Sequence, residues 1–130
     1  MNRQLFLDEV RRFEGCEYAL EEFSHSQHLK VAWTYLELYG YEAALARMRA
    51  GLLRFSAHHN KTGYNETITV FWLRKLQQHR GEDPEEFFPR AGKEALFRHY
   101  TRERVMSDQA KQAWIEPDLL PLWSEEVTRP

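Results

Sequence analysis

The stretch FSHSQHLKVAWTYLELY, residues 23–39, decides the fold that we expect for this chain. At about 100° of turn per residue, its apolar residues and both of its histidines fall on one face of a helix. That face carries His25, His28, Leu29, Ala32, Leu36 and Tyr39. Ser24 precedes the helix as a cap and Gly40 follows it as a stop. The stretch therefore predicts an amphipathic helix whose apolar face begins with two imidazole rings.

Two longer segments after this helix also carry helical patterns. Residues 41–58 repeat apolar side chains at helical spacing, and residues 65–80 are apolar on nearly every side, which indicates a central helix. Because the connection at Gly40 is short, the first two helices are expected to pack antiparallel. In this up-down-up order, the first and third helices start at the same end of the bundle.

Turn residues predict shorter helices in the rest of the chain. Asp83-Pro84, Thr101 and Ser107 are typical helix starts, and residues 93–100 form another short helical segment. No segment shows the alternation of a strand. We therefore expect an all-α fold, a compact single-domain bundle of five to seven helices over residues 1–130. Residues 1–17 would form an N-terminal strap or helix, and residues 116–130, with Trp123, an extended C-terminal tail.

Composition and charge restrict the class of protein. The chain has 130 residues, of which 42% are hydrophobic, so it can bury a real core. Its net charge is −2 and no basic block occurs, which argues against a nucleic-acid partner. No apolar run is long enough for a membrane span, and the N-terminus is too charged for a signal peptide. Cys16 is the only cysteine, so an internal disulfide is ruled out. We expect a cytoplasmic monomer or homodimer.

His25 and His28 are the first candidate site. A spacing of three places both imidazoles on adjacent turns of one helix face, close enough to share a ligand. Neutral imidazole suits a divalent transition metal, but a metal site needs more than two protein ligands. His59, at the end of the second helix, is a further candidate ligand. The alternative is structural: His25 caps the helix or meets solvent, and His28 is a hydrogen-bonded core residue.

The start of the central helix, YNETIT at residues 64–69, is the second candidate site. It gathers a phenol, an amide, a carboxylate and two hydroxyls at a helix N-terminus. Glu66 could serve as a third metal ligand or a general base, and Tyr64 could orient a substrate or donate a proton. We expect Asn65, Thr69 and Trp33 to contact a substrate. The alternative is simple capping, in which Asn or Thr closes the helix and the acid complements its dipole.

Four strings together give the chain a resemblance to a known group of proteins. They are FSHSQHLKVAWTYL from residue 23, YNETIT from residue 64, HYTRERVMS from residue 99 and IEPDLLPL from residue 115. With these strings, the chain resembles a family of small, uncharacterised bacterial helical proteins over most of residues 23–122. The family often has histidine after the tyrosine of the second string, which implies a cluster of three histidines from two helices. Here that position is Asn65, and the resemblance implies no particular activity.

Two functions are consistent with these patterns. The first is a small enzyme acting on a small molecule by metal-assisted or acid/base chemistry, with His28, Glu66 and Tyr64 as catalytic residues. The second is a non-catalytic ligand-binding or protein-interaction module in which the same groups form a buried structural network. A buried polar group without a partner costs about 1–3 kcal/mol, so several of them in one place indicate either a hydrogen-bond network or a ligand pocket.

Overall fold

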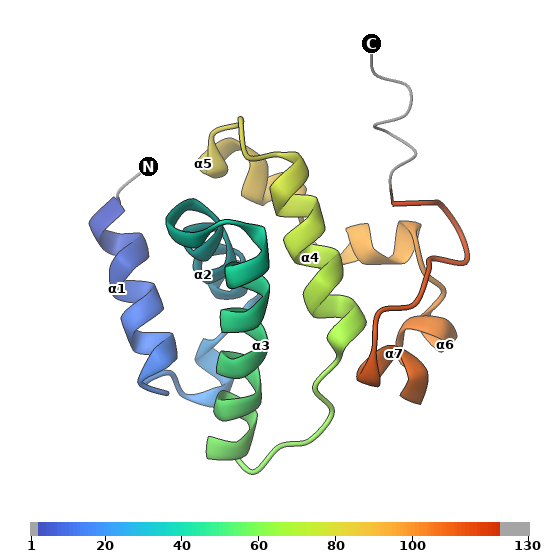
Figure 1. The fold of residues 1–130 in the computed structure, drawn as a ribbon, viewed down its shortest axis with the longest axis horizontal. Coiled ribbons are helices and arrows are strands. Elements are labelled where there is room, and N and C mark those ends of the chain that lie inside the picture. The colour runs from blue at the N-terminus through green and yellow to red at the C-terminus, as the bar shows by residue number, and fades with distance from the viewer. Residues whose placement is uncertain (1–2, 123–130) are drawn as a thin grey trace.

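Four longer helices form the framework of the computed structural model, which describes residues 3–122 (Figure 1). They are α1 (Arg3–Glu14), α2 (His25–Tyr39), α3 (Tyr41–His58) and α4 (Glu66–Gln78). The shorter elements are η1 (Leu20–Glu22), α5 (Pro84–Phe87), η2 (Phe88–Arg90), η3 (Lys93–Arg98), α6 (Arg102–Val105) and α7 (Asp108–Gln112). Residues 3–122 contain no strand, which confirms the predicted all-α bundle. No helix of this part combines the length and the apolar character that a bilayer crossing requires.

The predicted capping residues set the ends of these helices. The Ser24 hydroxyl accepts a hydrogen bond from the Gln27 amide at the start of α2 (3.4 Å). Gly40 ends α2 and begins α3 with a φ of +83°, a left-handed conformation that glycine adopts without strain. The side chains of Thr101 and Ser107 cap α6 and α7 in the same way as Ser24 caps α2. The single-residue joint at Gly40 makes α2 and α3 antiparallel neighbours, as predicted (Figure 1).

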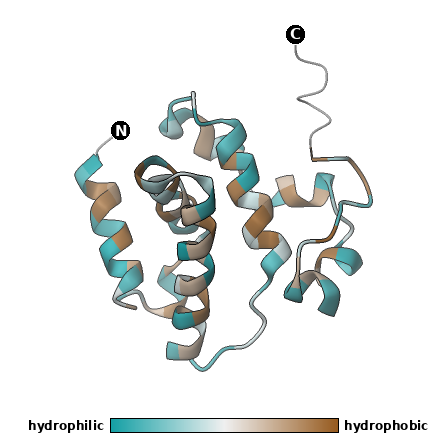
Figure 2. Cartoon of the chain, viewed as in Figure 1, coloured by the Kyte–Doolittle hydropathy of each residue, from teal (hydrophilic) through white to brown (hydrophobic). Residues whose placement is uncertain are grey.

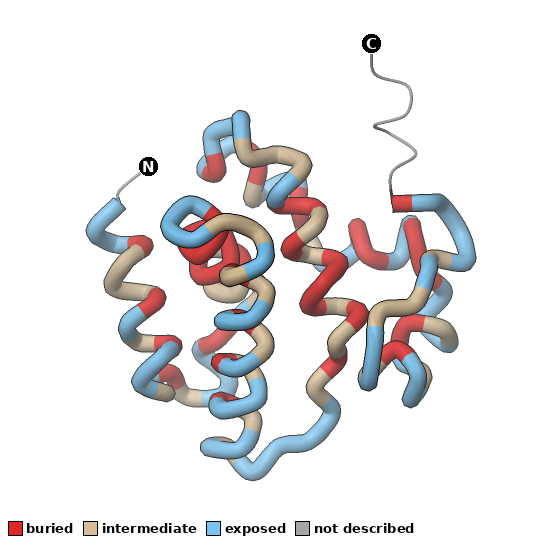
Figure 3. The backbone as a smooth tube through the Cα atoms, viewed as in Figure 1, coloured by how far each residue is buried: buried red, intermediate tan, exposed pale blue. Residues whose placement is uncertain are grey.

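α4 lies between two clusters of buried side chains. The larger cluster is built mainly from α1, α2 and α3, and Leu73 and Leu76 of α4 belong to it. The smaller one joins Phe71 of α4 to Tyr100, Leu122 and neighbouring side chains. Figure 2 shows hydrophobic residues recurring along α4, and Figure 3 shows buried positions along most of its length. The prediction of a central helix is therefore confirmed.

The segment after α7 runs without helix against α4 and against residues 99–101. The Thr67 hydroxyl of α4 donates to the carbonyl of Ala113 (2.8 Å) and accepts from the amide of Ile115 (3.2 Å). The amide of Leu119 donates to the carbonyl of His99 (2.9 Å). Residues 113–122 contain no helix and bend at residues 118–120, whereas Trp123 and residues 124–130 of the predicted extended tail lie outside the described residues.

The contact between Gly51 of α3 and Phe13 of α1 gives a test of the helix packing. Alanine normally stabilises a helix relative to glycine, by about 1 kcal/mol. A Cβ at Gly51 of α3, however, would lie 2.6 Å from Cζ of Phe13. The Phe13 ring is fully buried and stacked on Phe23, with 4.9 Å between ring centroids, so it has little room to move. We expect Gly51→Ala to lower the free energy of unfolding by about 1–3 kcal/mol, measured by chemical denaturation.

Gly81→Ala is the matched control, because nothing lies within 4 Å of a Cβ built at that position. We expect this variant to stay within about 0.5 kcal/mol of the parent. If Gly51→Ala proves as stable as Gly81→Ala, the close contact between α3 and Phe13 is not the one described here.

Candidate functional site

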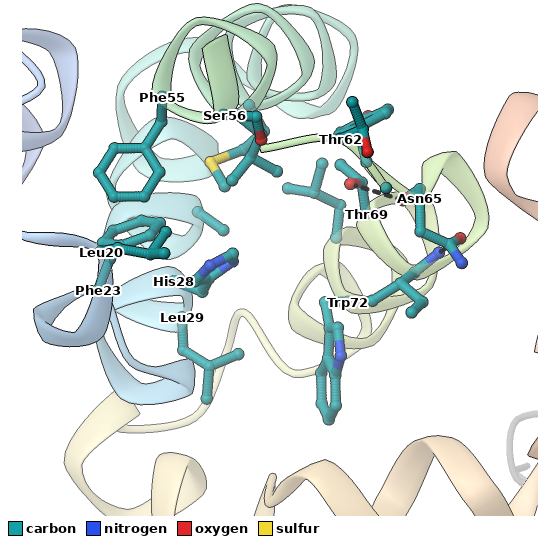
Figure 4. Close-up of a pocket in the computed structure, with 17 residues that line it drawn as sticks. Leu20, Phe23, His28, Leu29, Phe55, Ser56, Thr62, Asn65, Thr69 and Trp72 are labelled. Atoms are coloured by element: carbon teal, nitrogen blue, oxygen red, sulfur yellow. Dashed lines mark hydrogen bonds between the residues drawn. The ribbon is translucent and has the colours of Figure 1, made fainter. Parts of the chain in front are cut away.

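A cavity of about 300 Å³ lies between α2, α3, α4 and the loop that joins α3 to α4 (Figure 4). This volume is at the lower end of the range of about 300–1,000 Å³ that is typical of small-molecule pockets. Aliphatic and aromatic side chains form most of its wall, and the rings of Phe23, Phe55 and Trp72 are among them. The few polar side chains come from the start of α2, the end of α3, the loop and the start of α4. The up-down-up order predicted from the sequence brings these segments together.

The imidazole of His28 lies at the centre of this wall (Figure 4). Its ring packs against that of Phe23, with 4.2 Å between centroids. Within residues 3–122, neither ring nitrogen has a hydrogen-bond partner. The ring is half-buried and lines the cavity, so its nitrogens are accessible from the cavity. A molecule in the cavity, water included, can therefore hydrogen-bond to it.

The environment of His28 keeps its imidazole neutral. The pKa of His28 is lowered to about 4, chiefly by burial and also by the charges of His25 and Lys93. In the neutral ring one nitrogen is a hydrogen-bond donor and the other an acceptor. His28 can therefore offer either polarity to a molecule in the cavity at neutral pH.

On the opposite wall, most polar groups at the start of α4 make hydrogen bonds to other parts of the protein. Oδ1 of Asn65 accepts from the amide of Ile68 (3.0 Å), so Asn65 is the N-cap of α4, as the capping alternative predicted. Its Nδ2 donates to the carbonyl of Val105 (2.7 Å). The Thr69 hydroxyl donates to the carbonyl of Asn65 (3.1 Å) and also lies beside the Tyr64 hydroxyl. All three of these predicted site residues, Tyr64, Asn65 and Thr69, line the cavity.

Glu66, by contrast, faces α3. Arg49 binds both of its carboxylate oxygens, with Nε at 3.0 Å and Nη2 at 2.6 Å, and the Tyr64 hydroxyl donates to Oε1 (2.7 Å). Burial alone would raise the pKa of Glu66, but the hydrogen bonds from Arg49 and Tyr64 lower it below its ordinary value. Burial and the bond to Glu66 raise the pKa of Tyr64, although its contact with Thr69 opposes this. Glu66 is therefore the anchor of an Arg49–Glu66–Tyr64 cluster and does not line the cavity.

His25 and Trp33 also lie outside the cavity wall. Nε2 of His25 donates to the carbonyl of Ala91 (2.7 Å), and its ring meets Trp72 edge-on, with 4.6 Å between centroids. Trp33 is buried against Phe88, with 5.9 Å between ring centroids. The substrate contact predicted for Trp33 has no counterpart in this arrangement, because the indole belongs to the core that joins α1, α2 and η2.

The side chains expected to bind a metal are not gathered at one point. His25 is bound to Ala91, Glu66 is held by Arg49, and Nε2 of His59 donates to the carbonyl of Tyr18 (3.1 Å). Within residues 3–122, no three His, Cys, Asp or Glu side chains are placed to hold one ion. Asn65 stands where the resemblance implied a third histidine, and its amide is used in the fold. The donor set does not fit a three-histidine metal cluster, and we assign no role to a metal ion.

Several lining residues were not expected from the sequence. Phe23, Phe55 and Trp72 have the spacing of ordinary core residues, and no sequence signal separates a ring that faces a cavity from one that faces another side chain. Ser56 lies on the α3 wall, next in sequence to the core residue Phe55. Arg49 lies off the apolar stripe of its helix, as do other arginines, so only the packing of α3 on α4 identifies it as the partner of Glu66.

Comparison of this chain with known protein families, with characterised proteins and with solved structures finds no match. The resemblance to a family of small bacterial helical proteins therefore stays a prediction.

The low pKa of His28 makes a prediction about stability. Since the unfolded chain binds a proton near pH 6.5 and the folded chain only near pH 4, His28 contributes stability above pH 6.5 that is lost as the pH falls toward 4. Relative to His28→Leu, the parent should lose about 2 kcal/mol of unfolding free energy between pH 7 and pH 5. Urea denaturation of both proteins across this range measures the difference.

At pH 7 we expect His28→Leu to be at least as stable as the parent, because leucine removes an unpartnered polar group from an apolar surrounding. If His28→Leu is less stable than the parent at pH 7 and shows the same pH dependence, two claims fail. His28 would then not be a neutral residue with a lowered pKa, and its ring would have a stabilising partner in the fold.

The Arg49–Glu66 pair can be tested by a double-mutant cycle. The bidentate geometry predicts a coupling of roughly 1 kcal/mol between Arg49→Met and Glu66→Gln at low salt, and a smaller value at high salt. The control cycle uses Arg80→Met and Glu37→Gln, a partly exposed pair with a single contact at 3.6 Å, for which we expect coupling close to zero. Equal couplings in the two cycles would show that the bidentate contact does not persist in solution.

Proposed function

We propose that this protein binds a small molecule in the cavity between α2, α3 and α4, and that His28 makes the main polar contact with it. The observation that carries this proposal is an imidazole in an apolar wall whose ring nitrogens have no partner within residues 3–122. A binding pocket typically combines such a wall with a small number of polar groups that fix the orientation of the ligand. A ligand that hydrogen-bonds to His28 would use the one imidazole that the fold leaves open to the cavity.

Acid/base catalysis at the same residues has less support. A general base works best when its pKa is close to the operating pH, whereas burial lowers the pKa of His28 to about 4. Glu66 is bound by Arg49, and the pKa of Tyr64 is raised, so neither exchanges a proton readily at neutral pH. The geometry therefore favours binding over turnover as the role of the cavity.

A purely structural network accounts for only part of the site. The Arg49–Glu66–Tyr64 cluster and the Asn65 cap are satisfied within the fold and need no ligand. His28 takes part in none of these hydrogen bonds. A protein-interaction module would leave its position unexplained, because His28 lines a pocket of molecular size formed by three helices and a loop.

The proposal is tested with apolar fragments and with neighbouring variants of α3. Ser56 lines the cavity, whereas Ala57 is exposed and does not. We expect neutral aromatic fragments to shift the amide NMR signals of residues around the cavity in the parent and in Ala57→Leu. In Ser56→Leu the added side chain occupies the cavity, so the affinity should fall by roughly tenfold or more. Titration followed by amide NMR gives both the affinity and the position of binding.

Ser56→Ala removes the hydroxyl without adding volume, and it should bind nearly as well as the parent. Binding that survives in Ser56→Leu, or signal shifts confined to residues outside the cavity, would contradict the proposed site.

A further inference from the structure

No ionised side chain lines the cavity beside His28. Among its lining residues in the described part of the chain there is no Asp, Glu, Lys or Arg. A neighbouring hollow between α4 and η3 shows the contrast, since Lys75, Arg90 and Arg98 all line it. A carboxylate, phosphate or ammonium group entering the cavity would lose its hydration without gaining an opposite charge, which is strongly unfavourable.

The charged side chains near the cavity do not supply an opposite charge for an ionised ligand. Arg49 and Glu66 are bound to each other by two hydrogen bonds, so the pair is neutral as a unit, and neither side chain lines the cavity. The positive charge of Lys93, which also lowers the pKa of His28, disfavours a second cation at this place. The electrostatic surroundings therefore select against ligands of either charge.

The hydroxyl groups of Tyr64 and Thr69, which line the cavity, have already used their hydrogens. Tyr64 donates to Oε1 of Glu66 (2.7 Å), and Thr69 donates to the carbonyl of Asn65 (3.1 Å). The Thr69 oxygen retains the capacity to accept, whereas the Tyr64 oxygen is also in contact with Arg49 and Thr69. Ser56 and Thr62 add hydroxyls to the cavity wall that can donate or accept. His28 adds one acceptor nitrogen and one N–H donor. A group that donates a hydrogen bond, such as a hydroxyl or an N–H, matches this set better than a group that only accepts.

We propose that the cavity binds an uncharged molecule with an apolar body the size of an aromatic ring and a hydroxyl or N–H group directed at His28. This inference rests on the proposed function and adds the chemical class of the ligand. The flat rings of Phe23, Phe55 and Trp72 suit such a body, because aromatic side chains bury large apolar surfaces and pack well against one another. Phenols, aromatic alcohols and neutral N–H heterocycles belong to this class.

Four fluorinated probes of similar size separate charge from hydrogen bonding. 4-Fluorophenol is neutral and donates, 4-fluoroanisole is neutral and cannot donate, 4-fluorobenzoate is an anion, and 4-fluorobenzylamine is a cation at neutral pH. Each is titrated with the full chain and with His28→Leu and followed by fluorine NMR. We expect 4-fluorophenol to bind the parent roughly tenfold more tightly than 4-fluoroanisole, and both ions to bind more weakly than either. In His28→Leu the two neutral probes should bind equally well.

Each outcome bears on a separate part of the inference. Equal affinity of the parent for 4-fluorophenol and 4-fluoroanisole would overturn the hydrogen-bonding group and leave the proposed function standing. Tighter binding of 4-fluorobenzoate or 4-fluorobenzylamine would overturn the neutral class. A preference for 4-fluorophenol that persists in His28→Leu would overturn the role of His28. Failure of all four probes to bind the parent would overturn the inference and the proposed function together. If His28→Leu does not fold, His28→Met makes the same comparison with a flexible apolar side chain.

Discussion

Burial of α4 on two sides is the constraint on which the rest of the structure depends. Leu73 and Leu76 hold it against α2 and α3, while Phe71 and Thr67 hold it against the C-terminal segment. A helix in this position has little contact with water at its start, so the free backbone amides there need partners inside the protein. Asn65 supplies one through its cap and, with its other polar atom, ties α4 to the carbonyl of Val105. The amide that the resemblance aligned with a metal ligand is thus required by the fold.

The position of the cavity follows from the two connections of α3. At one end, Gly40 joins α2 to α3 with a single residue, which draws the two helices together. At the other end, residues 59–65 connect α3 to α4, and residues 60–63 of this loop are exposed (Figure 3). Thr62, Gly63 and Tyr64 of this loop line the cavity, so it lies at the loosely connected end of the three helices. Between α1 and α3 there is no comparable space, because the Phe13 ring lies too close to Gly51 to leave room for even a Cβ.

The sequence predicts the fold because its signals are local and mutually consistent. Ser24, Gly40, Thr101 and Ser107 mark helix ends through their own backbone and side-chain chemistry, and the broad apolar pattern of α4 reports its burial on two sides. The site is predicted only in part, because it depends on where side chains point after packing. His28 and Thr69 face the same space as expected, whereas Glu66 turns to Arg49, a contact that no spacing along the chain encodes.

The two histidines of α2 show why spacing alone does not define a site. Three residues along a helix correspond to a rotation of about 60° around its axis, which keeps two side chains on one face but allows them different neighbours. His25 lies under the segment that follows η2 and gives its Nε2 hydrogen to the Ala91 carbonyl. His28, one turn deeper, has Phe23 on one side and the cavity on the other. The first ring is satisfied by the backbone and serves the packing of the bundle. The second has a polar edge that a molecule in the cavity can reach, and this difference, rather than the shared motif, is the reason for proposing His28 as the ligand contact.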